Sequence, residues 1–268
     1  MFSKQIHIVF NSNEESRITF PILEHSPNTL YYFTAVIRDT GQKDENLSFY
    51  EKNIHILRKK IPQLEIINRE VDYTNYIEII QEISKIIDEE RKKNNNCKIY
   101  INISSGSKMT AVASIEASKL WNCEVYYVYS TLYDPSGDGP QHKGDMIIKT
   151  PITFPIKKPD EIYIKILKFI SQLIEKRYKN KDYNETLSKF IYKKTLIQEL
   201  YEAGYVRLET KNKDPRKLKS SKYMKSNKYL KVLERELNYI DVSDDRRNKK
   251  IYINEIGKEI LKIFKYKI

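Results

Sequence analysis

Hydrophobic and polar positions follow two alternating periods over the first 150 residues. Apolar runs typical of buried strands occur at 5–10, 29–37, 64–71, 98–104 and 123–130. Between these runs, apolar residues recur at helical spacing, near 17–25 and at 47–60, 74–92 and 109–121. Strands that alternate with helices of this length predict βαβ units. With right-handed crossovers, they predict a Rossmann-like, doubly wound parallel sheet of the α/β class.

The pattern changes after a proline-rich stretch. Three prolines fall within 150–160, which predicts a boundary between a domain at 1–154 and a second one at 155–268. Beyond it we expect helices at 160–178, 184–203 and 218–238, two short β-like runs at 239–242 and 249–253, and a last helix near 255–265. Helices followed by a charged hairpin and a closing helix are typical of a mostly α winged helix-turn-helix domain.

Charge separates the same two parts of the chain. The net charge is +12, yet the first 154 residues hold 18 Lys and Arg against 20 Asp and Glu. The remaining residues hold 30 against 16. A strongly basic part favours a polyanion partner, since Lys and Arg that neutralise phosphates release condensed counterions. A lysine-rich, solvated surface is the alternative interpretation.

Several protein classes are disfavoured by what the sequence contains. The two cysteines, Cys97 and Cys123, form no CxxC, which excludes a disulfide scaffold and a cysteine zinc site. The longest run without Asp, Glu, Lys or Arg, 25–37, is shorter than the roughly 18 apolar residues of a membrane span. The first residues show no basic segment followed by a long apolar one. We therefore expect a cytoplasmic protein without a membrane partner.

A polar loop with one glycine follows the fourth predicted strand and leads directly into a helix. Its sequence is Ser104-Ser105-Gly106-Ser107-Lys108-Met109. Ligands of open parallel sheets bind at the carboxyl ends of strands, where helix N-termini offer free N–H groups to phosphate. Gly106 allows a close backbone approach, while the serines and Lys108 add donors. The loop matches neither GxxxxGK[ST] nor GxGxxG, so triphosphate hydrolysis is not indicated. An ordinary turn with a capping serine remains the alternative.

The first predicted strand ends in a similar way, at Asn11-Ser12-Asn13. In a doubly wound sheet the first and fourth strands lie side by side, so that both polar loops face one crevice. For these three residues alone, helix capping is the simpler role. The pair of loops indicates a ligand more strongly than either loop does.

These two loops resemble those of the CRISPR-associated Rossmann fold, or CARF, domain. With the winged helix that follows, the chain resembles archaeal CARF–HTH transcriptional regulators. This resemblance implies a homodimer whose paired domains bind a cyclic oligoadenylate, here expected to be cyclic tetra-adenylate, as the regulatory ligand, with no other cofactor. It assigns the ligand contacts to Asn11, Ser12, Asn13, Ser104, Ser105, Gly106, Ser107, Lys108 and Met109. Ser105 departs from the threonine of many relatives, and the loop 134–145 has no counterpart that can be aligned.

The basic part carries the candidate DNA contacts. On a helical projection of 218–238, Leu230 and Leu233 lie on the side opposite to a row of cations, as a recognition helix requires. A charged segment, 244–250, separates the two predicted wing strands. The predicted contacts to double-stranded DNA are Lys222, Lys225, Lys228, Lys231, Arg235, Arg246, Arg247 and Lys249.

Enzymatic alternatives have weaker sequence support. All four histidines lie at or before His142, so the Arg-x4–6-His motif that the resemblance associates with HEPN ribonucleases has no place in the basic part. Glu209 and Lys211 match the E-x-K part of a PD-(D/E)xK nuclease, but no convincing metal-binding aspartate strand precedes them. Ring-nuclease cleavage of the cyclic ligand by Lys108 and the serines is a further alternative. We assign no catalytic or metal-binding residues, and a DNA-binding regulator is the preferred interpretation.

Overall fold

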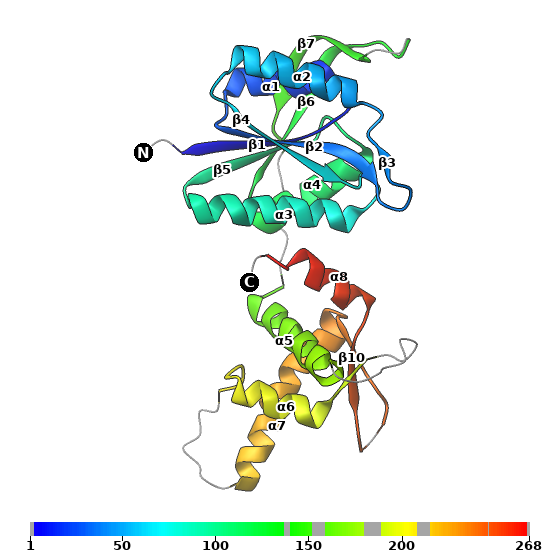
Figure 1. Ribbon diagram of the computed structural model, residues 1–268. Helices are drawn as coiled ribbons and strands as arrows, with labels where there is room; N and C mark the ends of the chain where they lie inside the picture. The colour runs from blue at the N-terminus through cyan, green and yellow to red at the C-terminus, as the bar shows by residue number, and fades with distance from the viewer. Residues whose placement is uncertain are drawn as a thin grey trace. The chain divides into compact units, whose positions relative to one another are not determined.

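The computed structural model describes residues 3–136, 140–151, 159–179, 189–207, 215–245 and 247–266 (Figure 1). These residues divide into two compact units, one up to residue 151 and one from residue 159 onward. Each unit is described by itself.

The first unit is built on a seven-stranded, mostly parallel sheet. Its strand order is β3-β2-β1-β5-β6-β7, and β4 also pairs with β2. The parallel strands are β1 (Lys4–Phe10), β2 (Thr29–Ile37), β4 (Glu65–Val71), β5 (Cys97–Asn102) and β6 (Glu124–Tyr133). The first and fourth predicted strands are neighbours, since His7 of β1 is paired with Tyr100 of β5. The predicted Rossmann-like α/β architecture of this unit is confirmed.

Four helices cover the sheet, two on each face (Figure 1). They are α1 (Glu15–His25) and α2 (Leu47–Lys60) on one face, and α3 (Tyr76–Lys93) and α4 (Lys108–Trp121) on the other. Apolar side chains of β1 and β2 pack against α1 and α2 in one fully buried cluster that includes Val9, Ile18, Leu30 and Leu57. Burial of such side chains drives the packing of these helices on the sheet, at roughly 1.5–3 kcal/mol for each large side chain.

Two antiparallel strands extend the sheet beyond the predicted elements. Strand β3 (Gln42–Lys43) pairs with the end of β2, and β7 (His142–Lys149) forms a hairpin with β6. Strand β7 begins with His-Lys-Gly-Asp, so its first half lacks the apolar residues from which a strand is predicted. Part of the segment 134–145 therefore belongs to this hairpin, while residues 137–139 lie outside the described ranges.

The second unit combines helices with a small sheet of order β8-β10-β9. Its elements are α5 (Glu161–Tyr178), β8 (Ile191–Tyr192), α6 (Lys193–Glu202), α7 (Pro215–Lys231), a π-helical turn (Val232–Glu236), β9 (Ile240–Val242), β10 (Lys250–Ile253) and α8 (Glu255–Ile263).

The predicted helix at 184–203 is wrong at residues 189–192. Residues 191–192 pair with β10, and the helix begins only at Lys193. The aromatic and β-branched sequence Phe190-Ile191-Tyr192 favours a strand, and the carbonyl of Lys249 accepts a hydrogen bond from Lys193 N. Residues 184–188 of this prediction lie outside the described part of the chain.

Candidate ligand pocket and nucleic-acid interface

The loop after β5 is held in a fixed shape by its own hydrogen bonds. Asn102 Oδ1 accepts from Ser104 N at 2.8 Å, which turns the chain away from the strand. Ser107 is the N-cap of α4, and its hydroxyl accepts from Thr110 N at 3.1 Å while Thr110 Oγ1 accepts from Ser107 N at 2.9 Å. This capping box satisfies donors that a helix start otherwise leaves open.

Gly106 is required by both the backbone and the packing of this loop. Its φ is +82°, a conformation that side chains other than glycine rarely adopt. A Cβ at this position would lie 2.6 Å from Thr110 Oγ1 and 2.7 Å from Phe10 Cβ. The loop backbone thus rests directly on the last side chain of β1.

The other predicted ligand residues of this loop differ in their exposure and in their hydrogen bonds. Lys108 and Met109 are exposed at the start of α4. The hydroxyl of Ser104 accepts a hydrogen bond from Val128 N, so this serine ties the loop to β6. Ser105 is buried, and its hydroxyl oxygen has no hydrogen-bond partner among the described residues. Burying such a group alone costs about 1–3 kcal/mol, which a ligand or water can recover.

The loop after β1 lies at the same edge of the sheet, but its first residue serves the fold. Asn11 is buried and donates from Nδ2 to Asp44 Oδ2 at 2.9 Å and to the carbonyl of Asn46 at 2.8 Å. Its Oδ1 accepts from the hydroxyl of Tyr32 at 3.0 Å. The side chain of Asn11 is therefore committed to the loop that follows β2. Ser12 and Asn13 are half-buried beside it.

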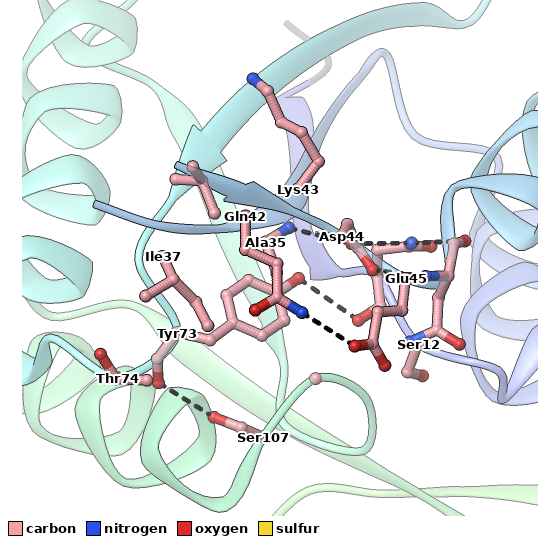
Figure 2. A pocket seen from close by; sticks show the side chains of 14 residues that line it. Ser12, Ala35, Ile37, Gln42, Lys43, Asp44, Glu45, Tyr73, Thr74 and Ser107 are labelled. Carbon is pink, nitrogen blue, oxygen red and sulfur yellow. Dashed lines mark hydrogen bonds between the residues drawn. The ribbon is translucent and has the colours of Figure 1, made fainter. Parts of the chain in front are cut away.

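A pocket of about 270 Å³ opens where these loops meet at the carboxyl ends of β1, β2 and β4 (Figure 2). Four of the predicted ligand residues line this pocket, namely Asn11, Ser12, Gly106 and Ser107. The others, Asn13, Ser104, Ser105, Lys108 and Met109, are not among its lining residues. The remaining lining residues are Ala35, Val36, Ile37, Gln42, Lys43, Asp44, Glu45, Asn46, Tyr73 and Thr74.

Sequence reasoning missed these pocket residues, which come from the end of β2, from β3 and the turn that follows it, and from the loop after β4. Asp44 accepts hydrogen bonds from Ala35 N at 2.9 Å and Asn46 N at 2.8 Å, and so fixes the turn around β3. Tyr73 donates from its hydroxyl to the carbonyl of Phe33 at 3.0 Å, and burial raises its pKa well above the usual value. One signal in the sequence could have indicated them: polar loops that follow parallel strands all lie at the carboxyl edge of the sheet, so the loops after β2 and β4 are expected beside the other two.

The hairpin of β6 and β7 is anchored to the start of α1. The carboxylate of Glu14 lies 2.9 Å from His142 Nδ1, within hydrogen-bond distance, and accepts from the backbone N–H groups of Gln141 and His142. Arg17 is buried and donates from Nε to the carbonyl of Val128 at 3.0 Å. These contacts hold the described part of the hairpin against the start of α1.

In the second unit, the predicted cations of α7 occupy different environments. Lys228 and Lys231 are exposed, and so is Arg235 in the π-helical turn. Lys225 donates from Nζ to the carbonyl of Arg207 at 3.0 Å. Lys222 lies with its Nζ 3.7 Å from the centre of the Tyr201 ring, a cation–π contact. The helix also exposes Met224, with 68% of its surface accessible, and Tyr223.

A basic groove of about 730 Å³, hereafter the α6–hairpin groove, lies between α6, α7 and the β9–β10 hairpin. Of the predicted DNA contacts, Lys222, Arg247 and Lys249 line it. The sequence analysis missed its other cations, Lys193, Lys194 and Lys219. Glu199 is the one acidic residue among the described residues that line the groove, so the described lining is strongly positive. Its remaining lining residues are Tyr192, Thr195, Ile197, Gln198, Tyr223 and Asn248.

Other predicted cations belong to a different surface. Lys225 and Lys228 line a second cavity, of about 810 Å³, together with Arg207 and Tyr205. The structure therefore divides the predicted DNA contacts between at least two surfaces. Arg246 lies outside the described residues, as do Glu209 and Lys211 of the nuclease alternative.

Within the described ranges, no helix has the length and apolar character needed to cross a bilayer. The same residues contain no group of three or more His, Cys, Asp and Glu side chains arranged to hold a metal ion.

Comparison with known proteins finds a family model for the first unit, one curated relative and several solved structures of low identity. A family model described as "HFX_2341_N:-like, N-terminal" matches residues 5–133. The uncharacterized protein MJ1513 of Methanocaldococcus jannaschii is 29% identical over 143 residues, which cover 52% of this chain and 41% of that protein. The chain thus spans well under half the length of this curated relative.

Solved structures are similar at low identity. Can2 from Sulfobacillus thermosulfidooxidans, in complex with cyclic tetra-adenylate, has a TM-score of 0.37 at 12% identity, over 98% of this chain and 64% of that chain. Enterococcus italicus Csm6, bound to cyclic hexa-2'-fluoro-hexa-dAMP, has a TM-score of 0.41 at 8% identity, over 89% and 55%. This chain therefore corresponds to less than two thirds of either structure.

Proposed function

We propose that this chain is a CARF-type sensor of cyclic oligoadenylate joined to a winged helix that binds double-stranded DNA. One observation carries the sensor part. The loop Ser104–Lys108 leads from a central parallel strand into the capped start of α4, and only glycine fits its closest point of approach to β1. This arrangement leaves backbone N–H groups and Lys108 at the strand edge where open α/β sheets bind their ligands.

The loop offers different groups to a phosphate. Lys108 is exposed, so its ammonium can reach an anion without first breaking a buried contact. The buried hydroxyl of Ser105, which has no partner in the described structure, gains one when a ligand or ordered water arrives. The partial positive charge at the start of α4 favours the same sign of ligand.

A cyclic ligand with twofold symmetry is matched by a homodimer, in which each loop faces one half of the ring. Met109 and Val112 in the first turns of α4 are 41% and 53% exposed, beside Lys108. A second copy of this chain would cover these apolar side chains while bringing its own Lys108 to the ligand. A pocket of about 270 Å³ lies just below the usual range for drug-sized ligands, so one copy alone cannot enclose such a ring.

The order of elements in the second unit supports the winged-helix proposal. A helix, a short strand, two helices and a β-hairpin follow each other, as in winged helix-turn-helix domains. In that arrangement α7 is the recognition helix and the β9–β10 hairpin is the wing. The α6–hairpin groove brings cations from both elements together, which favours contacts to a DNA backbone.

Regulation requires that the ligand bind more tightly to one arrangement of the dimer than to the other. We propose that α5, which follows the boundary between the units, transmits this difference to the DNA-binding surfaces. The coupling is reciprocal, so DNA must change the affinity for the ligand by the same factor.

The deciding experiment measures equilibrium binding of labelled cyclic tetra-adenylate to the wild type, Lys108→Ala and Lys98→Ala. Lys98 is exposed on β5, and its substitution removes the same charge. We expect the wild type and Lys98→Ala to bind alike and Lys108→Ala to bind at least about tenfold more weakly, or about 1.4 kcal/mol. Equal binding by both variants would remove Lys108 from the site. If the wild type binds neither cyclic tetra-adenylate nor cyclic hexa-adenylate, the sensor proposal is overturned. Chromatography of the ligand recovered after binding shows whether the protein cleaves the ring.

A further inference from the structure

The pocket beside the β3 turn has the wrong charge for phosphate. Its acidic side chains are Asp44 and Glu45, while the ammonium of Lys43 is paired with the carboxylate of Glu70. In Figure 2 the side chain of Lys43 points away from Glu45 and Tyr73. A phosphate is therefore favoured near Lys108 and disfavoured here, which leaves the pocket to an uncharged part of a ligand.

The pocket also has an aromatic and an apolar side chain against which a flat ring can stack. The ring of Tyr73 and the side chain of Ile37 line one side of it (Figure 2). The hydroxyl of Tyr73 donates to backbone carbonyls, so the ring is held in place and presents only its apolar surface. Aromatic and apolar side chains of this kind stack against nucleobases. At about 270 Å³, the pocket has room for one base and not for a whole cyclic nucleotide.

Two polar side chains in this pocket retain hydrogen-bonding capacity. Gln42 Nε2 donates to Glu45 Oε1 at 2.9 Å, and both side chains are exposed. A carboxylate accepts several hydrogen bonds and a carboxamide has two N–H donors and one acceptor, so this single bond uses only part of what they offer. Asp44 differs, because its carboxylate already accepts from Ala35 N, Asn46 N and Asn11 Nδ2.

We propose that Gln42 and Glu45 recognise one adenine base of the ligand, an inference that rests on the proposed binding of cyclic oligoadenylate. The Glu45 carboxylate accepts from the exocyclic amino group, and the Gln42 amide donates to an adjacent ring nitrogen. Adenine presents this donor beside an acceptor, whereas guanine and hypoxanthine present a carbonyl oxygen in the place of the amino group. That oxygen would face the Glu45 carboxylate, so the pair selects adenine by attraction and rejects the other bases by repulsion.

The experiment compares cyclic tetra-adenylate with cyclic tetra-inosinate, in which a carbonyl replaces each amino group. Binding of both rings is measured by calorimetry for the wild type, Gln42→Ala, Glu45→Ala and Asp39→Ala. Asp39 is an exposed carboxylate in the same turn and does not line the pocket, so its variant controls for the loss of charge. All three substituted side chains are exposed, which makes a folding defect easy to exclude by thermal denaturation.

We expect the wild type and Asp39→Ala to bind the adenylate ring at least roughly tenfold more tightly than the inosinate ring. Gln42→Ala and Glu45→Ala should bind the adenylate ring less tightly, and Glu45→Ala should lose most of the preference for it. Unchanged affinity and preference in both variants would overturn the base assignment and leave the sensor proposal standing. Failure of the wild type to bind either ring would overturn the sensor proposal and the base assignment with it.

Discussion

Gly106 and Phe10 are packed so closely that a Cβ on the glycine would lie 2.7 Å from the Cβ of the phenylalanine. Phe10 is the last residue of β1, and Gly106 lies in the loop that follows the neighbouring strand β5. The contact joins the loop Ser104–Lys108 to the sheet. It therefore links the stability of the first unit to the geometry of the proposed site.

We predict that Gly106→Ala destabilises the first unit by about 2–5 kcal/mol. About 1–2 kcal/mol comes from the left-handed backbone and about 1–3 kcal/mol from overpacking against Phe10 and Thr110. Gly41→Ala is the matched control, since its φ is +70° but nothing lies within 4 Å of the added Cβ. Denaturant unfolding followed by the fluorescence of Trp121, the only tryptophan of the chain and a buried one, measures both variants. Equal losses would show that packing at Gly106 contributes nothing.

Asp44 stabilises the turn that closes the pocket, and its removal should loosen that turn. We predict that Asp44→Ala costs about 3 kcal/mol, because Ala35 N, Asn46 N and Asn11 Nδ2 lose a charged acceptor. Asp39→Ala, at an exposed position of the same turn, should change the free energy of unfolding by less than about 0.5 kcal/mol. Amide exchange should become faster at residues 38–46 in Asp44→Ala. Unaltered exchange there would contradict the anchoring role.

His7 should make the first unit less stable in mild acid. Burial and, to a smaller extent, the charge of His25 lower the pKa of His7 to about 3. In the unfolded chain the pKa is about 6.5, so between these values the unfolded state binds the extra proton. The free energy of unfolding therefore falls as pH drops through this window, by at most about 1.4 kcal/mol per pH unit.

The predicted pH dependence is checked by measuring the free energy of unfolding from pH 7 to pH 4.5. This range is chosen because carboxyl groups of the unfolded chain are still mostly ionised there. His7→Leu should flatten the slope of unfolding free energy against pH, even though it leaves the hydroxyl of Tyr126 without its 3.1 Å partner and lowers stability at pH 7. His55→Gln, at an exposed histidine, should keep the slope. A slope that survives in His7→Leu would assign the effect to other groups.

The sequence predicts most elements of the first unit because local and global signals agree there. Residues 29–37 and 47–60 have the bounds expected from their apolar periodicity. The edge strands β3 and β7 are missed because one is two residues long and the other begins with polar residues. Each forms an antiparallel pair with the strand that precedes it, β2 or β6, and this pairing leaves no apolar run in β3 or at the start of β7 for a sequence pattern to detect.

Only a minority of the residues that line the candidate pocket can be predicted from the sequence. Gly106 and Ser107 stand out because glycine is rare in this chain and a helix follows. Asp44 and Tyr73 carry no local signal, since their positions at the pocket follow from the packing of three loops. Asn11 is the opposite case. As a polar residue after a strand it is easily picked out in the sequence, but its side chain is used in hydrogen bonds that hold the fold together.

Gly257 allows α8 to pack closely against the strand side of the second unit. A Cβ there would lie 2.2 Å from the carbonyl oxygen of Tyr239. Backbone atoms cannot move aside as a flexible side chain does, so we predict that Gly257→Ala destabilises this unit by about 1–3 kcal/mol. Gly204→Ala, with a φ of +79° and nothing within 4 Å, should lose only the backbone contribution. Near-ultraviolet dichroism of the tyrosines follows the unfolding, and greater stability of Gly257→Ala would contradict the close packing.

Salt dependence tests whether the α6–hairpin groove contacts DNA phosphates. Each neutralised phosphate of a duplex contributes about 0.9 to the slope of log affinity against log salt. We predict that Arg247→Ala and Lys249→Ala each lower this slope by about one, because both cations line the groove and are exposed. Lys258→Ala on α8 is the matched control, since its ammonium pairs with Glu255 and lies outside the groove lining. A slope reduced equally by all three variants would mean that net charge, and not the groove, determines DNA binding.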